Sequence, residues 1–201
     1  MKKFFGFLAS EVALGTLIAL LSVSTAVASY EGAMADSEQN KYEILGMQFL
    51  NDGNAEYLTA NQQITQDYSY YDNWYLNVDE RPEIAAYYEG DFSQSLQDAI
   101  ARDNGIWDDA YYEDMYTYPN ELSNESDTNF EIGSQYDEKG DRLQLVMLIM
   151  ALGLALAAWG SLLGAESNMR IMFSLFGLIS FLAGMSLYIY YTFISPAVVA
   201  I

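Results

Sequence analysis

The distribution of charge along the chain limits its fold more than any other feature. Residues 30–141 contain 26 of the 28 acidic residues and four of the eight basic ones, so 26 negative charges against 4 positive ones leave a net charge of −22. Residues 1–29 and 142–201 together hold two acidic and four basic residues and are otherwise largely apolar. This pattern predicts an N-terminal membrane helix, an acidic domain in water and a C-terminal hairpin of membrane helices.

Three apolar stretches are long enough to cross a bilayer. A hydrocarbon core of roughly 30 Å needs about 20 apolar residues in a helix. The ranges 4–28, 143–163 and 171–194 each reach that length. We therefore expect a multi-pass protein of the plasma membrane, in contact with lipid.

The basic residues predict an orientation for these helices. Lys2 and Lys3 precede the first apolar stretch, and Arg170 lies in the short 164–170 connection between the other two. Cytoplasmic loops are enriched in Lys and Arg. The N-terminus and this connection are therefore expected in the cytoplasm, and residues 30–141 outside it.

Two basic residues oppose that orientation. Lys139 and Arg142 precede the second apolar stretch on the side assigned to the exterior. Asp137, Glu138 and Asp141 lie among them and outnumber them, so the expected orientation is kept.

The first apolar stretch has a second interpretation. Lys2 and Lys3, the apolar run and Ala26-Val27-Ala28 also fit a secretory signal with a small-residue cleavage site. The run is longer than the usual core of such a signal, and Glu11 interrupts it. These features favour a retained membrane helix over a cleaved signal.

The composition excludes several kinds of active site. The chain has no Cys and no His. It therefore lacks disulfides, thiolate ligands, the commonest general base and a zinc site of ordinary type. The acidic middle would also repel the phosphates of a nucleic acid. We expect a non-enzymatic protein without a cofactor or a resident metal.

The acidic middle is patterned for helices. Apolar and aromatic residues recur at three-, four- and seven-residue steps between Tyr42 and Tyr75. Asp52-Gly53-Asn54 interrupts this pattern and predicts a turn or a kink. A further helix is expected to begin at Pro82, in its first turn, and to end at Gly105.

The last part of the acidic middle leads to the membrane. Tyr118-Pro119-Asn120 predicts a loop, and residues 121–142 carry a helical pattern that is expected to continue into the second apolar stretch. No alternating strand pattern of useful length occurs. The predicted fold class is all-α, with three transmembrane helices and an acidic, Tyr-rich extracytoplasmic helical domain.

Glu11 is the first candidate site. It lies about seven residues inside the first apolar stretch, where a carboxylate costs several kcal/mol unless it is protonated, paired or hydrated. It could serve as an ion or proton site on a transport path, or as a neutral group that hydrogen-bonds between helices. The lack of a second titratable group near it favours the second role.

A cluster of oxygen ligands is the second candidate. Asp127, Asn129, Glu131 and Glu138 match four ligand positions of a calcium-binding loop. Ile132 stands where the sharp turn of such a loop needs Gly. We expect at most weak binding of divalent cations here, and a solvated acidic helix is the alternative.

Aromatic side chains of the acidic middle form the third candidate. Tyr combines contact area with a polar tip and is enriched at protein interfaces. Some of these residues must pack in the core, and the others are candidates for contact with a partner. The set comprises Tyr70, Tyr71, Trp74, Tyr87, Tyr88, Trp107, Tyr111 and Tyr112.

Pairs of small residues within the apolar stretches permit helices to approach closely. Packing within one three-helix bundle would use some of these pairs, and association with another chain would use the others. The pairs are Gly15 with Ala19, Gly160 with Gly164, and Ser180 with Gly184.

The order of these features resembles a broad group of uncharacterised prokaryotic three-span membrane proteins. The shared features are an inner N-terminal span, an external helical segment at 68–74, an acidic Tyr-rich helix at 83–101 and Glu-Lys-Gly-Asp-Arg at 138–142 before a closing two-span hairpin. The resemblance is architectural and covers nearly the whole chain. It implies the three-span topology and supplies no activity or catalytic residues.

Together these features predict a structural or accessory subunit of a homo-oligomer or of a larger membrane assembly. Two alternatives stay open. The first is a channel or transporter component that uses Glu11, and the second is an external module that binds cations or a cationic partner.

Overall fold

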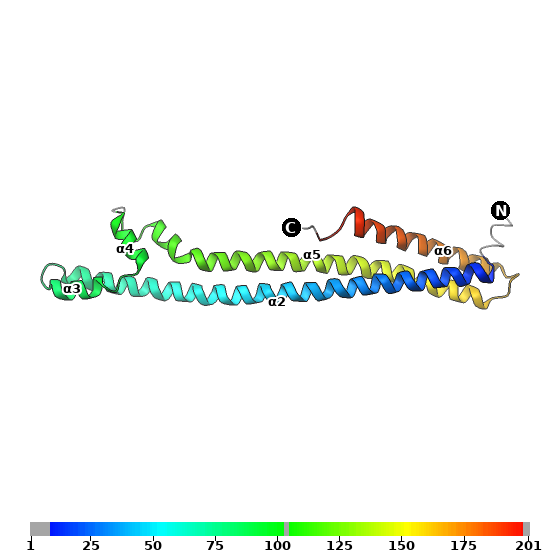
Figure 1. The fold of residues 1–201 in the computed structure, drawn as a ribbon, viewed down its shortest axis with the longest axis horizontal. Coiled ribbons are helices and arrows are strands. Elements are labelled where there is room, and N and C mark those ends of the chain that lie inside the picture. The colour runs from blue at the N-terminus through cyan, green and yellow to red at the C-terminus, as the bar shows by residue number, and fades with distance from the viewer. Residues whose placement is uncertain (1–8, 103–104, 199–201) are drawn as a thin grey trace. The chain divides into compact units, whose positions relative to one another are not determined.

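The computed structural model describes residues 9–102 and 105–198, and these two ranges contain helices and short connections but no strand. The all-α prediction is therefore confirmed. In chain order the elements are α2 (Glu11–Asn77), α3 (Pro82–Glu89), α4 (Gln94–Ala101), α5 (Asp109–Leu162), α6 (Asn168–Ile189) and the π-helical turn η1 (Tyr190–Ile194) (Figure 1).

The chain divides into two compact units. The first, called the span unit, comprises Met1–Glu43 and Glu131–Ile201, and the second, called the aromatic unit, comprises Ile44–Phe130. Both α2 and α5 contribute residues to each unit. The helix predicted at 121–142 does continue into the second apolar stretch, as part of α5.

Three helices are long and apolar enough to cross a membrane: α2, α5, and α6 continued by η1. This agrees with the three apolar stretches expected from the sequence, although residues 4–8 of the first stretch lie outside the described residues. The composition and length of these helices suggest a multi-pass membrane protein.

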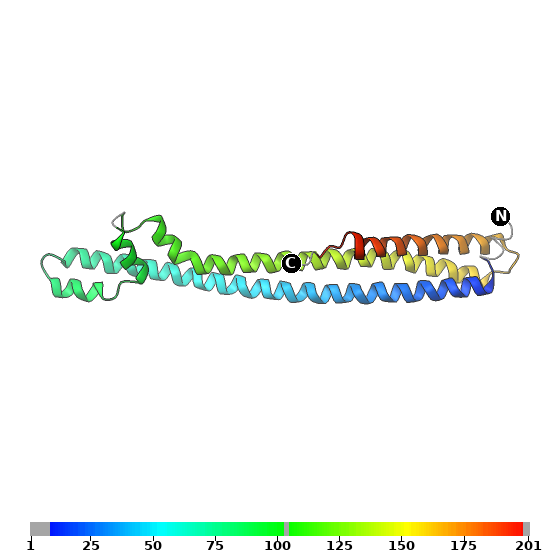
Figure 2. The same cartoon turned by 45° about the horizontal axis from the view of Figure 1, so that its top comes forward.

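The core of the span unit lies between its helices. Figure 2 shows α6 running beside the C-terminal part of α5. Small residues bring these two helices close together, because a Cβ added at Gly153 would lie 3.3 Å from the carbonyl oxygen of Gly177. The buried apolar side chains are Leu14, Leu17, Leu21 and Ala28 of α2 with Val146, Met150 and Ala157 of α5.

The turn predicted at Asp52-Gly53-Asn54 is wrong, because α2 is continuous through these residues. Glycine inside a helix costs about 1 kcal/mol relative to alanine. Here a Cβ added at Gly53 would lie 3.3 Å from the Cβ of Leu122 on α5. The glycine therefore permits a close contact between the two helices of the aromatic unit, and that contact offsets its low helix propensity.

The loop predicted at Tyr118-Pro119-Asn120 is also wrong, since Pro119 lies inside α5. Proline removes one backbone hydrogen bond and bends a helix. In Figures 1 and 2 the first turns of α5 bend away from the line of the rest of the helix. Pro119 is buried, so its ring contributes to the packing of the aromatic unit.

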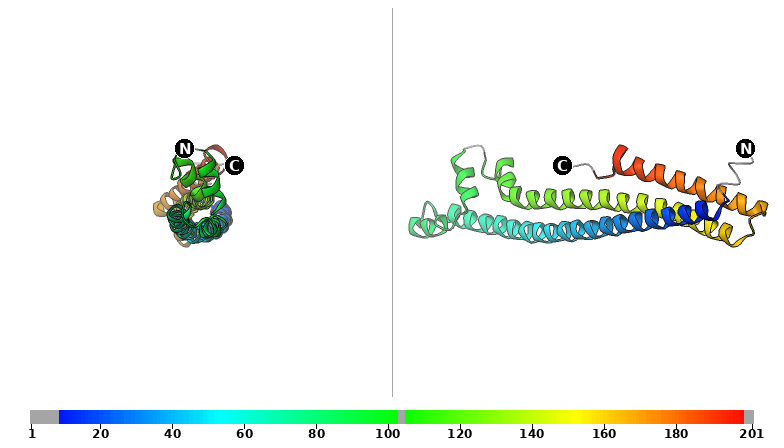
Figure 3. Two further views of the ribbon diagram at one scale, coloured as in Figure 1. Left: turned by 90° about the vertical axis from the view of Figure 1, so that its left-hand side faces the viewer. Right: turned by 45° about the vertical axis from the view of Figure 1, so that its right-hand side comes forward.

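Pro82 does begin a helix, as predicted, but this helix ends at Glu89 and not at Gly105. A second helix, α4, follows after Ser93, whose side chain accepts a hydrogen bond from the backbone N–H of Leu96 as an N-cap does. Figure 3 (right) shows α4 lying across α2 and not along it. The single helix expected from Pro82 to Gly105 is therefore two helices that run in different directions.

Candidate functional site

The aromatic unit contains one compact cluster of side chains. Its buried members are Ile64 of α2, Phe92 of the turn before α4, Leu96 and Ala99 of α4, and Tyr111 of α5. Trp74 and Trp107 pack against them at the edge. Four separate segments of the chain therefore meet in this cluster.

A carboxylate lies at the centre of this cluster. Asp67 of α2 has an exposed fraction of 0%. Its oxygens accept hydrogen bonds from the Tyr111 hydroxyl at 2.8 Å, from the Ser93 backbone N–H at 3.1 Å and from the Ser93 hydroxyl at 2.5 Å. Gln63 Nε2 donates a further bond at 3.3 Å. Asp67 thus joins α2 to the N-cap of α4 and to α5.

The phenols around Asp67 are held in their neutral, donating form. Burial first, and then the hydrogen bond to Asp67, raise the pKa of Tyr111 well above its ordinary value. Tyr112 shares a short hydrogen bond with Tyr68, and this bond raises the pKa of Tyr112 to about 12. Both phenols therefore stay protonated across the physiological pH range.

An ion pair closes the segment between α4 and α5. Arg102 donates to Asp108 from Nη2 at 2.7 Å and from Nε at 2.9 Å, and the Tyr111 N–H donates to the same carboxylate at 2.9 Å. The bond to Arg102, followed by that to Tyr111, lowers the pKa of Asp108. The stability that this depressed pKa contributes is present above the unfolded pKa and is lost as pH falls through the folded one.

The structure uses most of the predicted aromatic set inside the aromatic unit. Tyr111 is buried, and Tyr70, Tyr71, Trp74, Tyr88, Trp107 and Tyr112 are partly buried among other rings. Tyr87 differs from them, with an exposed fraction of 70%. Tyr75 and Leu76, at the end of α2, are exposed as well. Of the predicted set, Tyr87 is therefore the member whose ring is open to a partner, and rings outside the set, such as Tyr57 and Tyr118, are exposed as well.

The predicted cation ligands are not brought together as a loop. Asp127, Asn129, Glu131 and Glu138 all lie on α5, which is helical where a calcium loop would need a turn. The Asn129 amide donates to the Glu125 carbonyl at 2.7 Å. Among residues 9–102 and 105–198, no group of three or more His, Cys, Asp or Glu side chains is placed to hold a metal ion.

Glu11 lies in the first turn of α2. In the described part of the chain α2 begins at Glu11, and the Ser10 hydroxyl accepts a hydrogen bond from the Ala13 N–H at 3.2 Å, as an N-cap does. The carboxylate is exposed in the first turn, where the helix dipole favours negative charge. Glu11 forms no ion pair with Arg170, whose Nη1 donates to the Leu163 carbonyl at 2.9 Å.

The small-residue pairs of the membrane helices differ in use. A Cβ at Gly160 would lie 3.4 Å from the Cβ of Phe173, and one at Gly184 would lie 2.7 Å from Met150 Cγ. Ser180 packs against Gly153. These positions are filled by the chain itself. A Cβ at Gly15, in contrast, would meet no atom of residues 9–102 and 105–198 within 4 Å, and Ala19 is exposed as well.

The sequence interpretation missed Asp67. A signal for it exists, because Gly46, Gly53, Ala60 and Asp67 follow one another at seven-residue steps on α2. All four are buried in the aromatic unit. An acidic residue in register with a buried row of small residues is a candidate for a buried, hydrogen-bonded carboxylate.

Comparison with known proteins adds no information on function: no protein-family model, no curated protein and no solved structure matches the chain. The function must therefore be argued from the residues described above. The oxygens of Asp67 are enclosed by donors of the chain itself, which makes Asp67 a structural residue. The surfaces that remain open are the outer faces of the three candidate membrane spans and the exposed rings of the aromatic unit.

Proposed function

We propose that the protein is a non-enzymatic integral membrane protein that acts as a structural or accessory subunit of an oligomer. In this proposal α2, α5 and α6 cross the plasma membrane and residues 30–141 lie outside the cytoplasm. The apolar windows of the three helices have only 22, 28 and 17% of their residues buried within the chain. Lipid and neighbouring subunits would cover the others.

One observation carries the proposal of self-association. Leu14, Leu17 and Leu21 point into the core of the span unit, whereas Gly15 and Ala19 are exposed on α2. In a membrane, where lipid removes the hydrophobic drive for association, small residues favour contact because they let two backbones approach. The pair Gly15 and Ala19 is left open by the fold, so it is available to α2 of a second copy.

A cross-linking experiment tests this contact. The natural chain has no Cys, so a single introduced Cys reports on one position only. Oxidation of native membranes that contain the Ala19→Cys variant should give a covalent dimer, because the proposed contact brings the two copies of residue 19 close together. A gel without reductant measures the dimer fraction.

The control is Leu182→Cys on α6, which is also exposed but lies outside the proposed contact. It should stay monomeric, and adding Gly15→Leu to Ala19→Cys should abolish the dimer. Equal cross-linking at residues 19 and 182 would indicate random collision. A complete lack of cross-linking at residue 19 would contradict self-association through this face.

The orientation has its own test. Ser123 and Ala165 are both exposed, the first in the acidic middle and the second in the connection between α5 and α6. In intact cells, a membrane-impermeant thiol reagent should label Ser123→Cys and should reach Ala165→Cys only after permeabilisation. The opposite result would reverse the proposed orientation, and labelling of both in intact cells would contradict the three-span arrangement.

A further inference from the structure

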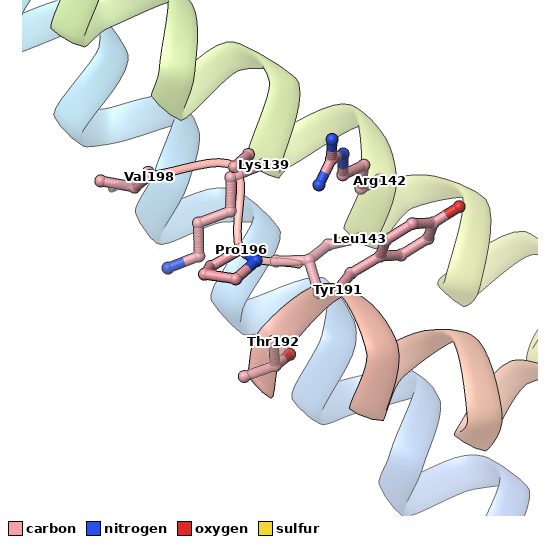
Figure 4. Close-up of a pocket in the computed structure, with 8 residues that line it drawn as sticks. Lys139, Arg142, Leu143, Tyr191, Thr192, Pro196 and Val198 are labelled. Atoms are coloured by element: carbon pink, nitrogen blue, oxygen red, sulfur yellow. The ribbon is translucent and has the colours of Figure 1, made fainter. Parts of the chain in front are cut away.

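A pocket of the span unit combines positive charge with apolar walls. Lys139, Arg142 and Leu143 of α5 form one side, and Tyr191, Thr192 and the segment after η1 form the other (Figure 4). The cavity measures about 80 Å³, which is several times the roughly 10–15 Å³ that one water molecule requires. It is therefore large enough to receive a chemical group and not only a single water.

Arg142 is held in place by neutral and aromatic groups as well as by a carboxylate. Its Nη1 donates to the Ser195 carbonyl at 2.7 Å, and its guanidinium lies 5.3 Å from the centre of the Tyr191 ring. Nη2 pairs with Glu138 at 2.6 Å, but that carboxylate is 57% exposed, and exposed ion pairs are worth at most about 1 kcal/mol. The guanidinium is thus oriented without being neutralised in a buried pair.

Lys139 contributes an ammonium group without a partner. No hydrogen bond or ion pair joins it to any residue in the described ranges, although acidic side chains outnumber basic ones along this part of the chain. Its side chain is half-buried against the pocket. Lys139 and Arg142 both line the cavity, with the Lys139 ammonium and the Arg142 guanidinium directed to opposite sides of Pro196 (Figure 4), and their two positive charges favour an anion at the cavity.

The pocket lies near the ends of two candidate membrane spans, and this position suggests which molecule carries the anion. Lys139 lies one helical turn before Leu143, where the apolar stretch of α5 begins, and η1 ends the third candidate span. Basic side chains at the ends of membrane helices reach the lipid headgroups. The lining residues Leu143, Pro196 and Val198 add apolar surface next to the two cations.

We propose that this pocket binds the headgroup of an anionic phospholipid, and that the positive charges of Lys139 and Arg142 attract its phosphate. Such a ligand also gives a role to Lys139 and Arg142. These two basic residues lie on the side assigned to the exterior, although Lys and Arg are enriched in cytoplasmic loops. The inference rests on the membrane insertion proposed above but not on self-association. Inorganic phosphate shares the same chemistry and is the competing source.

The test uses the full chain in mild detergent and counts bound lipid by native mass spectrometry. Phosphatidylglycerol should bind more tightly than phosphatidylcholine, which has the same phosphodiester but no net charge. Lys139→Gln should weaken phosphatidylglycerol binding about fivefold, since one basic residue near an anionic headgroup contributes on the order of 1 kcal/mol. Lys139 forms no hydrogen bond or ion pair with residues 9–102 or 105–198, so the variant should fold.

Lys41→Gln is the matched control, because it removes the same charge from a different part of the span unit and should leave lipid binding unchanged. Equal effects of the two substitutions, or equal binding of the two lipids, would overturn the proposal. Displacement of phosphatidylglycerol by millimolar inorganic phosphate would make free phosphate the ligand and overturn the lipid assignment.

A flotation assay separates this inference from the proposed function. With vesicles of phosphatidylcholine alone, the wild type and Lys139→Gln should both float, since insertion depends on the apolar helices. Failure of both to float would contradict membrane insertion itself. Flotation of both without any preference for phosphatidylglycerol in the binding assay would contradict the lipid pocket only.

Discussion

Replacing Asp67 with alanine should unfold the aromatic unit, with a loss of about 3–5 kcal/mol in its free energy of unfolding. The substitution leaves the Tyr111 hydroxyl and both Ser93 donors without an acceptor in a buried site. Each buried donor without a partner costs about 1–3 kcal/mol. Asp67→Asn should also destabilise the unit, but less, because its amide keeps one acceptor oxygen and places an NH2 donor against donors on the other side.

Tryptophan fluorescence of the full chain in detergent, recorded during urea denaturation, measures this effect. Trp74 and Trp107 lie at the aromatic cluster, and the remaining Trp159 is on the exposed face of α5. Asp72→Ala is the control, since Asp72 is an exposed carboxylate on the same helix and its loss should change stability by less than about 0.5 kcal/mol. Similar midpoints for the Asp67 and Asp72 variants would refute the central role of Asp67.

Replacing Gly153 with leucine should separate α5 from α6 and destabilise the span unit by about 3 kcal/mol, the upper end of the usual cost of overpacking. A Cβ at this position would lie 2.6 Å from the Cβ of Ser180 and 3.3 Å from the backbone oxygen of Gly177. Neither atom belongs to the flexible end of a long side chain. The helix backbones themselves would have to move.

Size-exclusion chromatography of the protein in detergent after heating measures the folded fraction. Gly15→Leu is the matched control, because a Cβ added at Gly15 would meet no atom of the described residues within 4 Å. It should keep the melting temperature of the protomer while it disrupts the proposed dimer. If Gly153→Leu melted at the temperature of Gly15→Leu, the close contact between α5 and α6 would be wrong.

Both predictions concern residues, Asp67 and Gly153, that the sequence interpretation did not single out. The apolar stretches, the helical patterning and the start of α3 at Pro82 were all predictable, because each is set by neighbouring residues along one helix. The breaks predicted at Gly53 and Pro119 were wrong. Local propensity disfavours helix at both positions, and contacts between α2 and α5 outweigh it.

The division of the aromatic residues could not be predicted either. Tyr87 and Tyr88 are adjacent and chemically identical, yet Tyr87 is exposed and Tyr88 packs beside Tyr70. Helical periodicity separates two such neighbours by about 100° but does not say which one faces inward. Which of the two rings faces inward depends on the direction of α3 relative to α2, and the turn after Asn77 sets that direction.

The sequence by itself determined the helical class and the three apolar stretches, because periodicity and hydropathy are properties of residues along a single helix. It also excluded His- and Cys-based chemistry, because the chain contains neither residue. The tertiary structure alone decided that Asp67 is buried among donors, that Gly153 and Gly177 meet, and that Lys139 and Arg142 share a pocket with residues that follow η1. Each of these contacts joins residues 24 to 59 positions apart, and no local pattern specifies which distant residues pack together.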